Sequence, residues 1–401
     1  MSYLETAQKL FDYIDASPTC YHAVKNAKER LLEKDFIELS EKETYHLEKG
    51  KNYFVVRNDS SLIAFTIPEK EAKGFRVMAS HSDSPCFKLK ENPEVILENA
   101  YVKFNVEKYG GMILSTWLDR PLSVAGRAVV KENGELVTKL VDFEENLCII
   151  PNVAIHFNRE INKGMEYNPQ VDMQPLWSAD KEDKVSSLLA EKLGVEEGQI
   201  LGTDLFVYNK EKSSFIGTDK TFFAAPRIDD LGCVFGSLEG FLTSENKEYI
   251  KMYCVFDHEE VGSRTRQGAD SDFLVTTMQR MGEALGFTKK LSQMYADSLL
   301  ISADNGHVLH PNHPEKSDSG NRPVLNGGIV LKYHGNQQYT TDAYTGAMVK
   351  DNCKKAELVY ENKSYSIYIY KAYRKIYSVK ERRTFITICS IICLRGEIWY
   401  E

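Results

Sequence analysis

The segment FRVMASHSDSP, residues 75–85, decides the fold of this chain. Its apolar first half runs directly into His81 and Asp83, and two later apolar segments, KMYCVF (251–256) and SLLI (298–301), run into polar clusters in the same way. Apolar strands that alternate with helical segments are typical of an α/β sheet. Because ligands of open α/β sheets bind at the carboxyl ends of the strands, we expect these clusters to converge.

A β-rich pattern interrupts the α/β pattern in the middle of the chain. Short alternating segments such as AYVKFNVEKY and RAVVKENGELVTKLVDF replace the longer helical segments there, and the ENGE of the second is a turn signal. We therefore predict an α/β core formed by residues 1–90 and 219–401, with residues 91–218 inserted as a β-rich domain.

Charge and length exclude several classes of protein. The 401 residues suffice for one large domain or two ordinary ones, and the net charge is −8 with no long block of like charges. Nucleic-acid binding needs a clustered basic face, so we expect no nucleic-acid partner. The longest late apolar run, FITICSIICL (385–394), is shorter than the ~20 residues that span a bilayer, so we expect no membrane association.

The cysteines and the N-terminus indicate a cytoplasmic protein. None of the eight cysteines forms a CxxC pair, which favours free thiols in a reducing compartment. The N-terminal residues carry acidic groups within a helical apolar pattern, where a secretory signal would have a basic region followed by an apolar one.

Four polar clusters carry the residues capable of chemistry. They are ASHSDSP with His81 and Asp83, APRIDDLGCVFG with Asp229 and Asp230, FDHEEVGS with Asp257, His258, Glu259 and Glu260, and SADNGHVLHPNHPEKSD with Asp304, His307, His310 and His313. Histidine nitrogens and carboxylate oxygens are ligands of divalent metals. Two metals ~3.5–4 Å apart need a bridging carboxylate, and a further carboxylate that binds no metal can take a proton from water.

Each cluster also has a simpler interpretation. The cluster with His81 and Asp83 could lie in a surface turn, and the pair of glutamates could lie on a solvated face. The pair of aspartates could lie at a helix N-terminus, where the helix dipole favours acidic residues. The three histidines of the fourth cluster could be ordinary loop residues. The occurrence of all four together, each at a strand end or a helix start, favours a metal site.

From about Ala7 to Leu358 the chain resembles the aspartyl aminopeptidase family of dinuclear zinc exopeptidases. Besides the four clusters, the resemblance rests on SPTCYHAV (17–24), KYGGMILSTWLDRPLSVAGR (108–127), PNVAIHFNR (151–159) and NGGIVLKYHGNQQYTTD (326–342). It implies a zinc-exopeptidase-like α/β/α sandwich as the catalytic domain. It also implies that the insertion mediates dimer contacts within a homo-oligomer, which in this family is a dodecamer.

The resemblance implies a role for each residue of the metal site. His81 and Asp304 resemble terminal ligands of one zinc ion, and Asp229 resembles the carboxylate that bridges two ions. Glu260 resembles a ligand of the second ion, and Glu259 resembles the general base. The reaction would be the hydrolysis of the N-terminal residue from a peptide by water that two metals activate.

Three further residues have counterparts in the family. Asp83 resembles the carboxylate that orients the ring of a metal-bound histidine. His156 is similar to a histidine that reaches the active site of a neighbouring subunit, and Lys332 matches a lysine near the substrate pocket. The family name implies peptides with an N-terminal Asp or Glu as substrates, although the range could be broader.

The C-terminal segment departs from the family pattern. From Val359 to Glu401 the chain is rich in Tyr, Ile, Lys and Arg, with a single Gly and no Pro, Asp or His. The second zinc of the family takes a late histidine after a glycine-rich loop, whereas the last histidine here is His334. We interpret residues 359–401 as an aberrant tail from an out-of-frame or degraded gene end. A one-nucleotide shift near codon 358 should then restore both features.

Two alternatives to an active aminopeptidase remain open from the sequence. The missing late histidine favours a catalytically impaired or dead relative that acts only as a metal-binding oligomer subunit, with one of its two zinc sites incomplete. A different two-metal hydrolase, acting on amides or phosphoesters, is less consistent with the order of the motifs.

Overall fold

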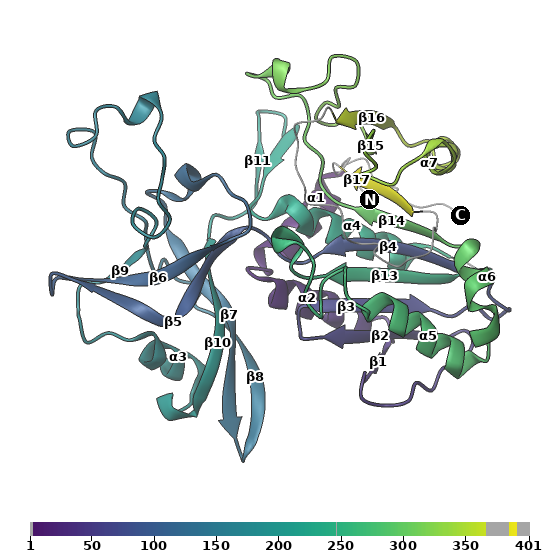
Figure 1. Ribbon diagram of the computed structural model, residues 1–401, viewed down its shortest axis with the longest axis horizontal. Helices are drawn as coiled ribbons and strands as arrows, with labels where there is room; N and C mark the ends of the chain where they lie inside the picture. The colour runs from purple at the N-terminus through teal and green to yellow at the C-terminus, as the bar shows by residue number, and fades with distance from the viewer. Residues whose placement is uncertain (1–2, 246, 366–384, 391–401) are drawn as a thin grey trace. The chain divides into compact units, whose positions relative to one another are not determined.

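The computed structural model describes residues 3–245, 247–365 and 385–390 (Figure 1). The chain divides into two compact units. The first takes in described residues within 1–16, 23–83 and 227–401, and the second takes in residues 17–22 and 84–226. The β-rich segment 91–218 lies within the second unit.

A nine-stranded mixed sheet forms the centre of the first unit. Its strands lie in the order β1 (Ile37–Leu39), β2 (Asn52–Arg57), β3 (Ser61–Thr66), β13 (Ile250–Phe256), β4 (Phe75–His81), β14 (Leu299–Ala303), β17 (Phe385–Ser390), β15 (Ile329–His334) and β16 (Tyr360–Tyr365). The three neighbours β13, β4 and β14 are parallel to one another. Their side chains are mostly buried, as expected for central strands covered on both faces.

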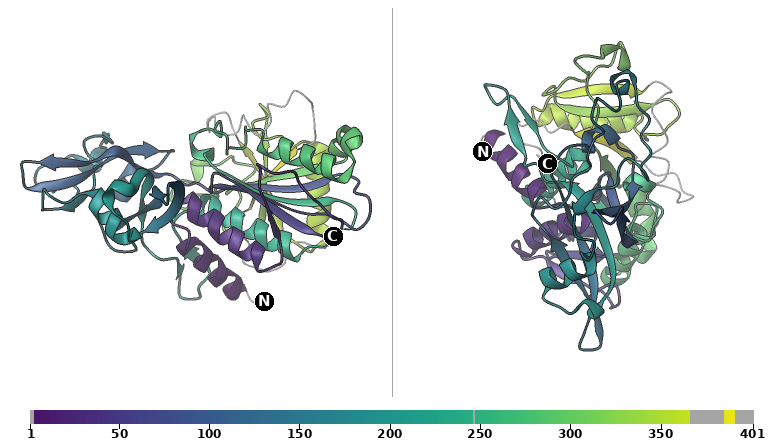
Figure 2. Two further views of the ribbon diagram at one scale, coloured as in Figure 1. Left: turned by 90° about the horizontal axis from the view of Figure 1, so that it is seen from below. Right: turned by 90° about the vertical axis from the view of Figure 1, so that its left-hand side faces the viewer.

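Helices cover both faces of this sheet. They are α1 (Tyr3–Asp15), most of α2 (Cys20–Leu32), α4 (Ile228–Thr243), α5 (Phe273–Leu285), α6 (Leu291–Ala296) and α7 (Ala343–Lys355). The left view of Figure 2 has the purple N-terminal helices and the green α5–α6 pair on opposite sides of the strands. The predicted α/β/α layering is therefore confirmed.

Successive residues of β13 face opposite helix layers, as the alternation of side chains along a strand requires. Met252 packs in the cluster that includes Met281 of α5. Tyr253 points to the other layer, where its ring lies 5.9 Å from that of Phe241 and its hydroxyl donates to the Val234 carbonyl at 3.1 Å. One strand thus anchors α4 and α5 on its two faces.

The second unit is built on a six-stranded antiparallel sheet. The strands lie in the order β8 (Glu135–Asp142), β7 (Leu122–Glu132), β10 (Ile200–Asn209), β5 (Cys86–Leu97), β6 (Tyr101–Tyr109) and β9 (Leu176–Ser178). The unit adds α3 (Val185–Leu193) and the short hairpin β11 (Ser214–Ile216) and β12 (Phe222–Ala224). The predicted ENGE turn is confirmed, because Glu132 pairs with Glu135 and both central residues have positive φ.

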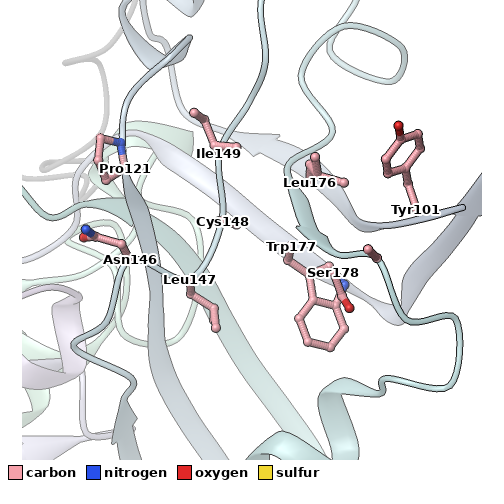
Figure 3. Close-up of a pocket in the computed structure, with 10 residues that line it drawn as sticks. Tyr101, Pro121, Asn146, Leu147, Cys148, Ile149, Leu176, Trp177 and Ser178 are labelled. Carbon is pink, nitrogen blue, oxygen red and sulfur yellow. The ribbon is translucent and has the colours of Figure 1, made fainter.

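An open pocket of about 460 Å³ lies in the second unit (Figure 3). Apolar side chains form most of its wall, which comprises Tyr101, Pro121, Asn146, Leu147, Cys148, Ile149, Leu176, Trp177, Ser178 and Ala179. A β-bridge between Ile149 and Leu176 joins two of the lining segments. None of the site residues predicted from the sequence lines this pocket.

Short 3₁₀ helices complete the described elements. They are η1 (Leu114–Trp117), η2 (Ile161–Lys163), η3 (Glu197–Gln199), η4 (Glu259–Val261), η5 (Thr288–Lys290) and η6 (Pro314–Lys316). Across the parts of the chain that the structure describes, no helix combines the length and apolar character needed to cross a membrane.

Two parts of the predicted tail take part in the main sheet. Residues 360–365 form β16, and residues 385–390 form β17, which pairs in parallel with β14 and antiparallel with β15. The rest of the tail, residues 366–384 and 391–401, lies outside the described residues.

Gly126 of β7 lies too close to β10 to carry a side chain, since a Cβ there would be 1.9 Å from the Asp204 carbonyl oxygen. We expect Gly126→Ala to lower the free energy of unfolding of the second unit by about 1–3 kcal/mol, the usual cost of overpacking. Denaturant or thermal unfolding measures this loss. Gly202→Ala in β10 is the matched control, because a Cβ at Gly202 meets nothing within 4 Å. Equal losses from both substitutions would contradict the described strand packing.

Candidate metal centre

The carboxyl ends of three parallel strands bring the polar clusters to one edge of the main sheet. His81, the last residue of β4, pairs with Phe256, the last residue of β13. On the other side of β4, Ala79 pairs with Ser302 of β14, two residues before Asp304. The strand register alone therefore places three of the four clusters side by side.

The imidazole of His81 lies at the centre of this edge. Its Nε2 is 3.4 Å from Asp229 Oδ1, 3.9 Å from Glu259 Oε2 and 4.0 Å from Asp230 Oδ2. The side chain is almost fully buried, yet among the described residues Nε2 has no hydrogen-bond partner. Buried polar atoms are nearly always hydrogen-bonded. This exception, which faces several carboxylates, therefore fits a nitrogen that binds a cation.

Two overlapping groups of side chains could hold a metal ion. One is His81 with Asp229 and Asp230, and the other is His81 with Glu259 and Glu260; within each group the ligand atoms lie within 4.8 Å of one another. One nitrogen with several carboxylate oxygens is a donor set that zinc accepts. The residues at this edge therefore fit a metal centre.

Asp83 connects the ring of His81 to the main chain of the glutamate pair. Its Oδ1 accepts the Glu259 main-chain N–H and its Oδ2 accepts the Glu260 main-chain N–H, each at 3.1 Å. Oδ1 also lies 3.3 Å from His81 Nδ1, and the Asp83 carbonyl oxygen lies 3.1 Å from the same nitrogen. Asp83 thus stabilises a proton on Nδ1, the tautomer in which Nε2 is the nitrogen that binds a metal.

Lys332 faces a predicted metal ligand. Its ammonium donates to Asp304 Oδ1 at 3.1 Å and to the Asn305 carbonyl oxygen at 3.2 Å, and it lies 5.3 Å from the Tyr339 ring. Lys332 is 2% exposed and Asp304 is 4% exposed. Asp304 belongs to neither of the two groups around His81, and its Oδ1 forms a buried ion pair with this lysine.

The remaining predicted residue, His156, belongs to the second unit. It lies in the exposed segment that precedes η2. Its role at a neighbouring subunit stays a prediction.

Crowding of carboxylates shifts the pKa values at this edge. Burial raises the pKa of Glu259 to about 7 and that of Glu260 to about 8, and nearby carboxylates, led by Asp304 and Asp83 respectively, add to the rise. Burial alone would lower the pKa of His81, but the surrounding carboxylates outweigh it and raise that pKa well above its usual range. The cluster therefore has an excess of negative charge that a bound cation would offset.

The last histidine of the chain lies on a strand that leads away from this edge. Leu331 of β15 and Ala303 of β14 both pair with Ile388 of the intervening β17, but β15 runs antiparallel to β17. Each residue after Leu331 therefore lies further from the carboxyl edge. His334 is two residues beyond Lys332 in that direction.

Sequence reasoning did not assign two residues that touch the centre, Asp230 and Asn305, to the metal site. Asp230 is fully buried, and Asn305 donates to it and to the main chain at the start of α4. The helix-cap interpretation does not account for Asp230, whose other carboxylate oxygen accepts the His81 N–H. Asp230 follows Asp229 in the sequence and Asn305 follows Asp304, which was the available signal that both lie near the site. Sequence adjacency does not reveal the contacts that they make.

A layered α/β sheet with histidine and carboxylates gathered at the carboxyl edge of its parallel strands defines a metal-dependent hydrolase. The family model described as Aminopeptidase I zinc metalloprotease (M18) matches residues 13–365. The chain belongs to this family. A probable M18 family aminopeptidase 2 of Clostridium novyi is 42% identical over 369 residues, which cover 88% of this chain and 84% of that relative.

Solved structures agree with this assignment. A chain in the cryo-EM structure of the Ape4 and Nbr1 complex matches with a TM-score of 0.92 and 32% identity. The match covers 96% of the present chain and 80% of the chain in that complex. The S. cerevisiae mApe1 dodecamer matches with a TM-score of 0.83 and 28% identity, covering 96% and 90%. The predicted family, fold class and metal-dependent aminopeptidase assignment are thereby confirmed.

Asp83→Ala should weaken zinc binding by about 10–100-fold, the usual effect of losing a residue that orients metal ligands. The substitution removes the acceptor for two main-chain N–H groups and the partner of His81 Nδ1. Competition with a chromophoric chelator measures the zinc affinity. Asp219→Ala is the control, because Asp219 accepts the Thr221 N–H within a turn of the second unit. Unchanged affinity in Asp83→Ala would exclude this role.

Proposed function

We propose that the chain removes the N-terminal residue from peptides by means of water activated at two zinc sites. The observation that carries the proposal is the buried Nε2 of His81, which has no hydrogen-bond partner within the described residues and faces the carboxylates of Asp229 and Glu259. Membership of a zinc aminopeptidase family supports the metal and the reaction class.

The ligands would divide between two ions. His81 and Asp304 would hold the first ion, Glu260 would hold the second, and Asp229 would serve both. When bound, the zinc ions polarise the scissile carbonyl and lower the pKa of bound water to about 7. The 3.4 Å between His81 Nε2 and Asp229 Oδ1 and the grouping of His81 with Glu260 support this division.

Glu259 acts as the general base. It takes a proton from the attacking water and delivers it to the leaving amine. Its Oε1 is buried and makes no hydrogen bond within the described chain, so this oxygen is available to accept a proton. The contact between its main-chain N–H and Asp83 keeps the side chain directed at the centre.

The substrate class is an N-terminal Asp or Glu, with broader acceptance of other residues. This preference rests on the family resemblance. Lys332 places a positive charge beside the centre, although its ammonium is held by Asp304 and Asn305. We therefore assign Lys332 to the side of the substrate site nearest Asp304.

The active form is a homo-oligomer in the cytoplasm. Apolar side chains flank His156 in the second unit: Val153 and Ile155 are each 49% exposed, and Phe157 is 87% exposed. Such neighbouring exposed apolar residues favour a protein interface, and the similar mApe1 forms a dodecamer. In this arrangement His156 reaches the centre of a neighbouring subunit.

A specific observation also favours a second candidate, an impaired relative that serves as a metal-binding subunit. The described chain offers Glu260 and the bridging Asp229 to the second zinc, while His334 lies on the strand that leads away. Zinc prefers nitrogen or sulfur ligands in a closed shell. An aberrant tail from about residue 359 explains the lack of a late histidine.

Glu259→Gln should lower turnover at least ~100-fold, the lower range for loss of a general base. The substitution is made in the chain with its reading frame restored after codon 358, so that activity is high enough to measure. Zinc content should equal that of the unsubstituted protein, because Glu259 is not assigned as a ligand. Loss of zinc together with activity would instead make Glu259 a ligand.

The 401-residue chain should bind close to one zinc ion and hydrolyse aminoacyl substrates weakly or not at all. Only the first site keeps a full set of ligands, in His81, Asp229 and Asp304, and metal affinity depends on ligand count and geometry. Elemental analysis and a peptidase assay on the purified chain test this. Two tightly bound zinc ions with high activity would contradict it, and His307, His310 and His313 would then be substituted singly to find the replacement ligand.

A further inference from the structure

The two neighbouring aspartates of the IDDL segment have opposite environments. The Asp229 side chain is 53% exposed, and its Oδ1 faces His81 Nε2. Asp230 is 0% exposed, and the chain itself supplies donors to both of its oxygens. The Asp229 carboxylate is therefore half exposed beside His81, whereas the Asp230 carboxylate is buried and bonded within the protein.

Asp230 joins two of the segments that carry metal ligands. Its Oδ2 accepts the main-chain N–H of His81 at 3.1 Å, which ties the start of α4 to the end of β4. Its Oδ1 lies 3.4 Å from Asn305 Nδ2, which ties the same helix start to the loop after β14.

Asn305 completes the connection on the other side. Its Nδ2 donates to the Ile228 carbonyl oxygen at 2.5 Å, one residue before Asp229. Its own carbonyl oxygen accepts from Lys332 Nζ at 3.2 Å, and the same ammonium donates to Asp304 at 3.1 Å. A displacement of α4 or of the loop after β14 would break at least one of these bonds.

We propose that Asp230 and Asn305 are positioning residues, which form a buried link that sets the spacing between His81, Asp229 and Asp304. The inference rests on the proposed metal site. A buried carboxylate is costly unless it is hydrogen-bonded, and apolar residues often replace buried charged groups without loss of stability. The Asp230 carboxylate fixes the spacing of three segments that carry ligands by accepting hydrogen bonds from His81 and Asn305. An apolar side chain could not accept these hydrogen bonds.

The test uses three variants of the full chain: Asn305→Ala, Asp230→Ala and the double variant. Zinc affinity is measured by competition with a chromophoric chelator, and the melting temperature of each metal-free protein is measured alongside. Asn305→Ala should weaken zinc binding by about 10–100-fold. The double variant should bind zinc no more weakly than Asp230→Ala alone, because residues of one network are not additive.

Asn321→Ala is the matched control. Its Nδ2 donates to Asp318 Oδ1 at 3.0 Å within the loop that follows Asp304, but it joins no segments that carry ligands. The control should keep the zinc affinity of the unsubstituted chain.

Two results would overturn the inference. One is an unchanged zinc affinity in Asn305→Ala, whether or not the melting temperature of the metal-free protein falls. The other is additive losses in the double variant, which would make Asp230 a ligand in its own right. If Asp230→Ala does not fold, the half-buried Asn305 decides the question alone. Failure of the unsubstituted chain to bind zinc would instead overturn the proposed function, and this inference with it.

Discussion

The parallel pairing of β4 with β13 and β14 is the constraint on which the candidate metal centre depends. Because His81 pairs with Phe256, the residues that follow β13 begin beside the His81 ring. The carboxylate of Asp83 then fixes the arrangement, since it accepts both main-chain N–H groups of the glutamate pair and lies beside His81 Nδ1. The chemistry of the site thus follows from one strand register and one buried side chain.

The sequence was sufficient for those parts of the site that follow strand ends. An apolar run followed by histidine and acidic residues indicates both a central strand and the carboxyl edge of the sheet, so the sequence predicts that His81 and the glutamate pair meet at this edge. The β-rich pattern between them was equally visible, because side chains alternate with a period of two along half-buried strands.

The contacts between distant segments could not be predicted in this way. Asn305 bonds to a helix start 77 positions earlier in the chain, and no local pattern records such a pairing. The contact of Lys332 with Asp304 and the direction of β15 also depend on how the strands are ordered in the sheet. The sequence shows that His334 is the last histidine. It does not show that His334 lies on a strand that leads away from the edge, because that also depends on the order of the strands.

The position of the insertion has a consequence for the order of folding. The second unit leaves the core directly after Asp83 and returns at Arg227, so the contact between His81 and Asp230 closes a loop of about 149 residues. The entropy lost on closing a flexible loop grows with its length, and contacts between distant residues slow folding. An insertion that folds first as a compact unit shortens the effective loop. The rate at which the candidate metal centre assembles then depends on how fast the second unit folds. That unit supplies none of the ligands assigned to the centre of its own chain.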